Sequence, residues 1–375
     1  MTKNSASNID VKRVNRINVI RTIMTHDKIS QPELTHKLAI SWPTVLQNVK
    51  ELIDMGLVEE VGAFASTGGR RARAFAPVRN AKACVGIDIT QNHISFVLVN
   101  IAGDLIKFTR KKKAFVMSDD YLLELGKAVV AFVEESGFDV NNIISAGMSI
   151  PGIINDSGSY ILYSHVLKLE NTSANAFFRH IPFECRMIND ANAAGFAEMY
   201  GQSDKKNAFY ISLSNSVGGS IISSGMFYLG DNLRAGEIGH NTLYPGGDKC
   251  YCGKSGCFDA YCSVRVLTRY TDGDLVKFFG KIEHGDKELK QVWQQYLVDL
   301  SYAVNNLRMT LDCDVIIGGY VGGYLEDYQY ELQKLVSERN TFGYDASYVK
   351  ICRYKLEASA VGAALAEIDR YIRQI

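Results

Sequence analysis

The sequence predicts an α/β protein of 375 residues that begins with a small winged helix-turn-helix module and continues as two larger lobes. Two short amphipathic segments joined by a tight turn, and a candidate hairpin after them, indicate the first module. From residue 83 onward, apolar runs alternate with helical stretches, which is typical of α/β domains. The strand–turn–strand unit in ACVGIDITQNHISFVLVN recurs in AFYISLSNSVGGSIISSG, so we expect two related lobes with a cleft between them.

The composition fits a globular chain, with 47% apolar and 22% charged residues. The N-terminus MTKNSASNID lacks an apolar signal core, and no run approaches the roughly 18 apolar residues of a membrane span. We therefore expect a cytoplasmic protein with no membrane partner. In that compartment the eight cysteines are expected to be thiols or metal ligands rather than a disulfide framework.

Charge is distributed unevenly along the chain. The whole sequence is neutral, with 41 basic and 41 acidic residues, but residues 1–80 hold 12 Lys and Arg against 7 Asp and Glu. A basic module on a neutral or acidic body indicates a nucleic-acid partner for the N-terminal part.

The helices of the N-terminal module have clear start signals. In the first segment, apolar residues recur at three-residue steps: Val11, Val14, Ile17, Ile20 and Ile23. Ser30 and Glu33 form a predicted capping box for the next helix. Ser41 is the predicted N-cap of the helix after that, which ends at Gly56. The inward face of this last helix is expected to consist of Val45, Val49, Leu52 and Ile53.

The second helix of a helix-turn-helix enters the major groove of DNA. With the apolar face turned inward, Thr44, Gln47 and Asn48 are expected to point outward, and Gln or Asn can bond adenine bidentately. Ser41 and Lys50 complete the predicted DNA contacts of this helix. The alternative is an ordinary solvated face, since most protein–DNA contacts go to phosphate.

A wing is expected after the recognition helix. Strands at 57–61 and 72–77 would flank a Gly-rich tip bearing Arg70, Arg71 and Arg73. Arginines in this place suit phosphate or a narrow minor groove. A solvated arginine cluster is the alternative.

Three cysteines occupy eight positions in CYCGKSGCFD, residues 250–259. With His240 they form a candidate Cys3His set: His240, Cys250, Cys252 and Cys257. Thiolates and imidazole favour zinc over calcium or magnesium. A redox pair and scattered buried cysteines are the alternatives. A saturated four-ligand site would make the Zn2+ structural, one ion per chain.

Five motifs in the larger part resemble, in order, those of the ROK family of repressors and sugar kinases: SIPG (149–152), NDANAAGFAE (189–198), GEIGH (236–240), CYCGKSGCFD (250–259) and IIGG (316–319). The resemblance covers residues 83–375. It implies the actin-like (ribonuclease H-like) two-lobed sugar kinase fold, with the last helix returning to the first lobe. We expect a DNA-binding domain at 1–80, a small lobe at 81–199 plus 357–375, and a large lobe with the zinc site at 200–356.

The resemblance also implies the sugar contacts, which are Asn189, Asp190, Glu237 and His240. In the family the aspartate is the general base, and the histidine would ligate zinc with one nitrogen and face the sugar with the other. Asp259 stands where family members place a glutamate, so the reach of this contact is expected to differ. As an alternative, Asp190 could merely cap the following helix.

The phosphate-binding turns depart from the family pattern. The first lacks a glycine, since the strand ends in Asp88-Ile-Thr90, and the second has Ser214-Asn215-Ser216 where the family has Gly-Thr-Gly. Bulkier residues should obstruct phosphate approach, although Gly318 and Gly319 remain. We therefore expect Asp190 to be a vestigial base, with no catalytic residue.

Together these features predict a transcriptional regulator, expected to repress genes of carbohydrate uptake or catabolism. Its partners would be operator DNA, a sugar or sugar phosphate effector such as xylose or a hexose, and a second copy of the chain in a homodimer or higher homo-oligomer. Two alternatives stay open: an active sugar kinase that uses Asp190 and carries a DNA-binding domain, and a constitutive DNA-binding scaffold with a dead pocket.

Overall fold

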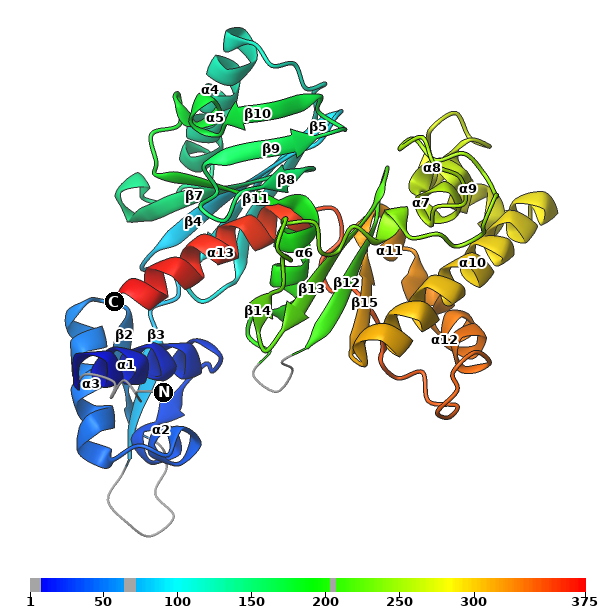
Figure 1. The fold of residues 1–375 in the computed structure, drawn as a ribbon. Coiled ribbons are helices and arrows are strands. Elements are labelled where there is room, and N and C mark those ends of the chain that lie inside the picture. Colours follow the sequence, from blue (N-terminus) through cyan, green and yellow to red (C-terminus); the bar gives the residue numbers. More distant parts are fainter. Residues whose placement is uncertain (1–7, 64–71, 203–206) are drawn as a thin grey trace.

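The computed structural model describes residues 8–63, 72–202 and 207–375. Figure 1 shows a small helical module beside the chain termini and two larger lobes built around separate sheets. Within the described ranges, no helix is both long and apolar enough to span a bilayer.

The N-terminal module is a winged helix-turn-helix, as predicted. Its elements are α1 (Asn8–Met24), β1 (Ile29–Ser30), α2 (Gln31–Leu38), α3 (Trp42–Asp54), β2 (Val58–Ala63) and β3 (Arg73–Pro77). The described strands pair in the order β1-β3-β2, all antiparallel. The Ser30–Glu33 capping box is present, and the Ser41 hydroxyl accepts a hydrogen bond from the Thr44 N–H at 3.3 Å.

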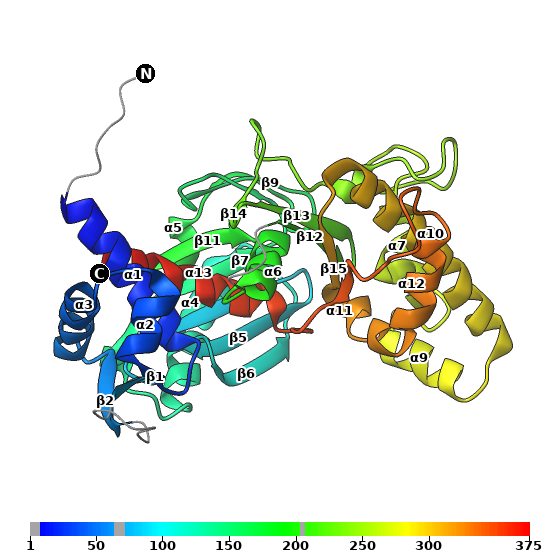
Figure 2. The ribbon, with the colours of Figure 1, turned by 90° about the horizontal axis from the view of Figure 1, so that it is seen from below.

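Two details of the predicted apolar faces are wrong. Ile20 and Ile23 are buried, but Val11 and Val14 are 48% and 52% exposed. Steps of three residues turn about 300°, so a stripe with this spacing drifts by about 60° per step around the helix. In Figure 2 the start of α1 projects from the rest of the molecule. Ile53 on α3 is 37% exposed, since it lies about 100° around the helix from the buried Leu52.

The first lobe contains the N-terminal half of the repeated arrangement. Its elements are β4 (Ala83–Ile89), β5 (His93–Asn100), β6 (Leu105–Lys112), α4 (Asp119–Glu134), η1 (Val140–Asn142), β7 (Ile143–Ile150), β8 (Ile153–Ile154), β9 (Tyr160–Ser164), β10 (Leu169–Ser173), α5 (Asn175–Phe178), β11 (Cys185–Asn189) and α6 (Asp190–Met199). The main sheet has the order β11-β7-β4-β5-β6, and β8, β9 and β10 form a separate antiparallel sheet.

The second lobe repeats the arrangement. Its elements are β12 (Ala208–Leu213), β13 (Val217–Ser223), β14 (Met226–Phe227), η2 (Ile238–His240), α7 (Asp259–Cys262), α8 (Val264–Thr268), α9 (Leu275–Glu283), α10 (Lys287–Leu311), β15 (Asp314–Gly318), α11 (Gly319–Gly322), η3 (Leu325–Tyr328), α12 (Gln329–Ser337), β16 (Val349–Ile351) and the last helix, α13 (Ala358–Gln374). Its sheet has the order β14-β13-β12-β15-β16, which corresponds to β6-β5-β4-β7-β11 of the first lobe when that sheet is listed from its other edge. In both sheets an antiparallel meander is extended by two parallel strands, so the prediction of two related lobes is confirmed.

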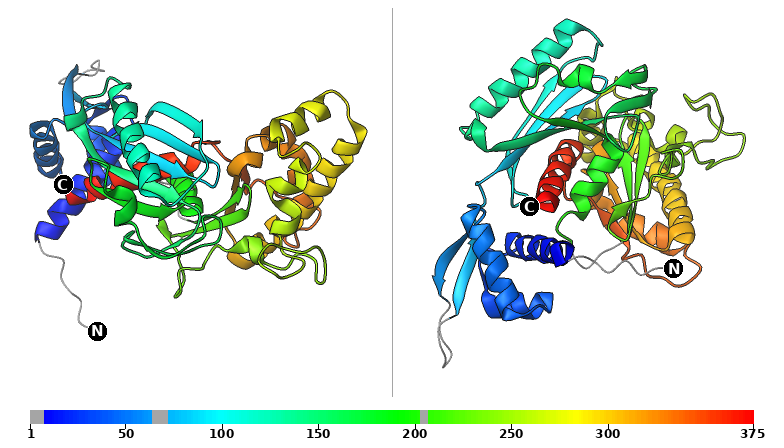
Figure 3. Two further views of the ribbon diagram at one scale, coloured as in Figure 1. Left: turned by 90° about the horizontal axis from the view of Figure 1, so that it is seen from above. Right: turned by 60° about the vertical axis from the view of Figure 1, so that its left-hand side comes forward.

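Helix α13 returns to the first lobe and lies directly on its sheet. A Cβ at Gly86 would stand 2.0 Å from the Ala360 carbonyl oxygen, and one at Gly147 would stand 2.1 Å from that of Ala363. Only glycine permits this approach. At its other end, α13 shares a hydrophobic cluster with α1, which includes Ile20 and Ile372. Figure 3 shows α13 between the winged module and the rest of the chain.

Candidate functional site

A cavity of about 960 Å³ lies between the two lobes. Its wall includes four of the five residues predicted as sugar contacts by family resemblance, namely Asn189, Asp190, Glu237 and His240. Two come from the junction of β11 and α6 in the first lobe, and two from the η2 turn in the second. The fold therefore brings amide, carboxylate and imidazole groups from distant parts of the chain to one cavity, as polyol recognition requires.

Asn189 and Asp190 have different local roles. The Asn189 side chain is the N-cap of α6, where its Oδ1 accepts from the Asn192 N–H at 2.9 Å. Its Nδ2 donates to the Gly152 carbonyl at 2.9 Å. Asp190 Oδ1 accepts from the Ala191 N–H at 2.9 Å. The cap is therefore supplied by Asn189, which leaves the Asp190 side chain on the cavity wall.

The carboxylates of the cavity are held in a weakly solvating environment. Burial raises the pKa of Asp190 to about 6, and the nearby charge of Glu237 adds to the shift. Burial also raises the pKa of Glu237. Behind them, burial raises the pKa of Asp88 to about 7, although Ser149 donates a 2.8 Å hydrogen bond to its Oδ1. Perturbed carboxyl groups gathered at a cavity are a recurrent feature of ligand sites.

The four predicted metal ligands are assembled beside the cavity. Their ligand atoms all lie within 4.8 Å of one another. Cys252 Sγ and Cys257 Sγ are 3.8 Å apart, and Cys250 Sγ lies 3.8 Å from His240 Nδ1. Zn–S bonds of about 2.3 Å in a tetrahedron place two sulfurs roughly 3.8 Å apart, so the set has the size of a zinc site. Gly253 and Gly256 make the turn with positive φ values of 90° and 80°.

His240 faces two ways, with Nδ1 toward the cysteines and Nε2 toward the cavity. Nε2 lies 3.2 Å from the Tyr251 hydroxyl, and the Tyr251 ring centroid lies 5.0 Å from that of His165. Both Tyr251 and His165 line the cavity, as does Tyr163 on β9. These three aromatic residues were not predicted. Tyr251 could have been predicted from its position between the candidate metal ligands Cys250 and Cys252, because a residue between two ligands must lie beside the site.

Asp259 requires a correction, because it does not line the cavity. The side chain is buried, its Oδ2 accepts from the Val217 N–H at 2.7 Å, and its Oδ1 pairs with Arg265 at 2.8 Å. The Arg265 guanidinium lies 5.1 Å from the Tyr251 ring centroid. The short carboxylate at the start of α7 thus reaches the β13 backbone and is connected to the cavity wall through Arg265 and Tyr251.

The lobes also meet beside the predicted phosphate turns. Arg110 on β6 donates to the Tyr320 hydroxyl on α11 at 2.9 Å, and its guanidinium lies 4.8 Å from the Tyr320 ring centroid. Tyr320 directly follows Gly318 and Gly319. A Cβ at Gly319, where φ is 77°, would stand 2.5 Å from the Leu213 nitrogen, so packing alone accounts for this glycine.

The recognition helix departs from its predicted DNA face at one residue. Asn48 is 1% exposed, and its Nδ2 donates to the Thr44 carbonyl at 2.7 Å, so its predicted outward orientation is wrong. Gln47 is exposed and donates to Glu51 at 3.4 Å. Lys50 is exposed as well. Asn48 lies between the buried Val45 and Leu52, where the turn of the helix points it inward.

The predicted wing falls partly outside the described residues. Arg73 lies at the start of β3, where it is exposed and 3.6 Å from Glu60. Arg70 and Arg71 lie outside the described residues.

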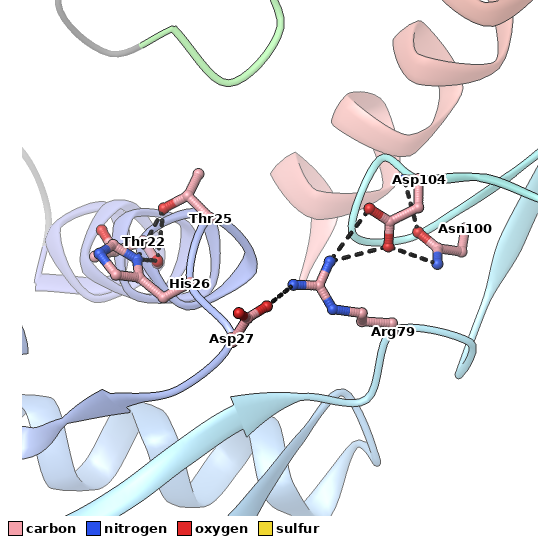
Figure 4. Close-up of polar contacts among 7 residues, drawn as sticks. All are labelled: Thr22, Thr25, His26, Asp27, Arg79, Asn100 and Asp104. Atoms are coloured by element: carbon pink, nitrogen blue, oxygen red, sulfur yellow. Dashed lines mark hydrogen bonds and ion pairs between the residues drawn. The ribbon is translucent and has the colours of Figure 1, made fainter.

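Polar contacts join the winged module to the first lobe (Figure 4). Arg79 pairs with Asp27 at 3.0 Å and with Asp104 at 2.9 Å, and Asn100 Nδ2 donates to Asp104 at 3.0 Å. A second connection runs from Arg21 on α1 to Asp369 on α13, at 2.5 Å.

Helix α13 thus touches both the module and the cavity. Its residues Ala363, Ala366, Glu367 and Arg370 line the cavity. Asp369, which forms the ion pair with Arg21, lies in sequence between the lining residues Glu367 and Arg370.

Comparison with known proteins relates both parts of the chain to described families. The ROK family matches residues 84–369, and a family described as winged helix-turn-helix DNA-binding matches residues 13–59. The xylose repressor of Bacillus spizizenii (strain ATCC 23059 / NRRL B-14472 / W23) is 27% identical over 267 residues, covering 69% of this chain and 68% of the relative.

Two solved structures have the same fold. A ROK family transcriptional regulator described as a homolog of the E. coli MLC protein superposes with a TM-score of 0.75 at 20% identity, covering 97% of both chains. A ROK family glucokinase from Streptomyces griseus, in complex with glucose and AMPPNP, superposes with a TM-score of 0.64 at 20% identity, covering 76% of this chain and 98% of the kinase.

Proposed function

Because the chain belongs to the ROK family, we propose that it is a sugar-responsive transcriptional regulator that represses genes of carbohydrate uptake or catabolism. Operator DNA would bind the winged module, and a sugar or sugar phosphate would bind between the lobes. The relative named a xylose repressor supports this assignment.

The observation that carries the proposal is the position of α13. One face of this helix lines the cavity, and its Asp369 pairs with Arg21 of the winged module at 2.5 Å. A ligand that moves α13 would therefore also change how the module is held. Such control needs a ligand that binds the two arrangements with different affinity.

The sugar contacts proposed are Asn189, Asp190, Glu237 and His240. Each has a hydrogen-bonding side chain on the cavity wall. Xylose or a hexose fits the size of the cavity and the chemistry of these groups. The aromatic ring of Tyr251 would supply an apolar surface for the sugar ring.

A structural Zn2+, one per chain, is proposed for His240, Cys250, Cys252 and Cys257. The 3.8 Å separation of the Cys252 and Cys257 sulfurs supports it, as does the 3.8 Å separation of Cys250 Sγ and His240 Nδ1. The metal would hold the turn that presents Tyr251 and would orient His240 so that Nε2 faces the sugar.

The protein is proposed to lack phosphoryl transfer, with Asp190 a vestigial base. Arg110 and Tyr320 fill the place where the lobes meet beside the phosphate turns. Bulky side chains there compete with the close backbone approach that phosphates need.

An active sugar kinase that uses Asp190 is the second candidate, since ROK kinases share the fold and Asp190 lies on the cavity wall.

We propose residues 1–80 as the DNA-binding domain, 81–199 with 357–375 as the small lobe, and 200–356 as the large lobe. A homodimer or higher homo-oligomer would let two modules read two half-sites.

The test selects an operator from random DNA with the full-length protein and measures its affinity with xylose, glucose, N-acetylglucosamine and their phosphates. We expect one sugar to change DNA affinity at least fivefold and to raise the unfolding temperature, with both effects lost in Asp190→Ala. Asp156→Ala, at an exposed carboxylate of the same cavity, is the control.

Two outcomes would contradict the proposal. Sugar-dependent release of ADP from ATP, abolished by Asp190→Ala, would identify a kinase. Specific DNA binding that responds to none of these sugars, without any thermal shift, would identify a constitutive DNA-binding protein.

A further inference from the structure

Two of the three large apolar side chains that stand exposed on the recognition helix α3 lie in its N-terminal half. Trp42 is 49% exposed and Leu46 is 40% exposed. They lie four residues apart, so they share one face of the helix, and Lys50 continues this row by another four residues. The row formed by Trp42, Leu46 and Lys50 is the outer face of α3.

The outer face is not needed to build the module. A separate face of α3 supplies the core through Val45, Val49 and Leu52, each at most 1% exposed. The Trp42 backbone is held in place, since its carbonyl accepts from Gln31 Nε2 of α2 at 3.4 Å. The contact with α2 therefore holds the Trp42 backbone, while about half of the side chain stays exposed.

The polar side chains expected to read bases are largely engaged within the module. Asn48 is buried, and the Gln47 amide donates to Glu51 at 3.4 Å. The Thr44 hydroxyl shares a 2.8 Å hydrogen bond with the Ser41 hydroxyl. Beside the exposed Gln47, the helix offers to a groove an apolar pair followed by a positive charge.

We propose that Trp42 and Leu46 contact the C5-methyl groups of thymines in the major groove of the operator. Thymine methyls are the apolar feature of that groove, and they are read by apolar side chains. The two Cα atoms are about 6 Å apart along the helix axis, against about 3.4 Å per base pair, so the pair can meet thymines one or two steps apart. Lys50 and the excess of basic residues in 1–80 complement the phosphates.

The inference rests on the proposed DNA-binding function, and its test separates the two. An operator is selected from random DNA with the full-length protein, and each thymine is then replaced singly by deoxyuridine, which removes only the methyl group. We expect about a fourfold loss of affinity at one or two thymines, the effect of exposing one buried methyl. In Leu46→Ala or Trp42→Ala, the loss at the matching thymine should disappear.

Val116→Ala is the matched control, because Val116 is an exposed apolar residue of the first lobe, 57% exposed. It should keep the deoxyuridine effect of the unmodified protein. Specific binding with no deoxyuridine effect at any thymine overturns the inference and leaves the function standing. A Trp42→Ala protein that changes oligomeric state but keeps every deoxyuridine effect also overturns the inference, because the outer face would then be an interface between two copies of the chain. Absence of any sequence-specific binding overturns both.

Discussion

The raised pKa of Asp190 leads to a prediction about stability and binding together. Burial raises this pKa from 3.8 to about 6, with the Glu237 charge adding to it. Asp190→Asn keeps the shape of the side chain and an oxygen that can accept from the Ala191 N–H, as Oδ1 does at 2.9 Å. The substitution removes only the charge that burial disfavours.

The magnitude follows from linkage between proton binding and folding. Because the folded state binds this proton more tightly than the unfolded state, the stabilisation is fully present below pH 4 and is lost as the pH rises through about 6. Raising the pKa from 3.8 to about 6 corresponds to about 3 kcal/mol, so we expect an effect of about 1–3 kcal/mol at pH 7. At pH 7 the variant should therefore be more stable than the unmodified protein, and at pH 4 the two should be alike.

Thermal unfolding followed by circular dichroism at pH 4, 5, 6 and 7 measures the effect. Asp156→Asn, at an exposed carboxylate on the same cavity, should follow the unmodified protein. The thermal shift caused by the effector sugar should be lost in Asp190→Asn and kept in Asp156→Asn. An Asp190→Asn protein that is less stable at pH 7, or that loses as much stability from pH 4 to 7 as the unmodified protein, would show that the buried charge of Asp190 does not destabilise the fold.

Three further predictions concern the other parts of the molecule. Asn48→Ala should lower the free energy of unfolding by about 1 kcal/mol, because loss of the 2.7 Å hydrogen bond and of a packed side chain outweighs removal of its unpartnered Oδ1; Gln47→Ala, at an exposed side chain, should change it less, and equal losses would contradict the buried placement. Cys252→Ser should reduce bound zinc, measured by elemental analysis, well below one ion per chain, whereas Cys185→Ser outside the cluster should retain it; full zinc in Cys252→Ser would count against the site. Arg21→Ala should still bind sugar but show a smaller sugar-induced change in DNA affinity, measured by fluorescence anisotropy, and an unchanged response would exclude the ion pair to α13 as a route.

Much of the site could be predicted because its parts are local in sequence. The ligand set around Cys250, Cys252 and Cys257 follows from short spacings and two turn glycines, and the structure brings these cysteines to His240 as expected. The same holds for the helix starts at Ser30 and Ser41, where a cap needs a residue type at a fixed offset.

Predictions failed where the outcome depended on which neighbours a side chain meets. Asn48 has a residue type suited to base contact, but the packing of α3 turns it inward. Asp259 matches a family position, yet its shorter side chain ends on the Val217 N–H and Arg265 rather than in the cavity. The length of a side chain, shorter by one methylene in Asp259, or its angular position on a helix, as for Asn48, decides which neighbours it contacts.

Residue types and short spacings were enough to predict the order of the modules, the N-caps of α2 and α3, the candidate metal-ligand set and the family. The packing of distant elements, by contrast, places α13 between the cavity and the winged module, brings Arg110 to Tyr320 across the lobes, and leaves Trp42 and Leu46 exposed. These are contacts between residues far apart in the chain, or the lack of cover over a face. Both are set by how whole elements pack, which local pattern does not encode.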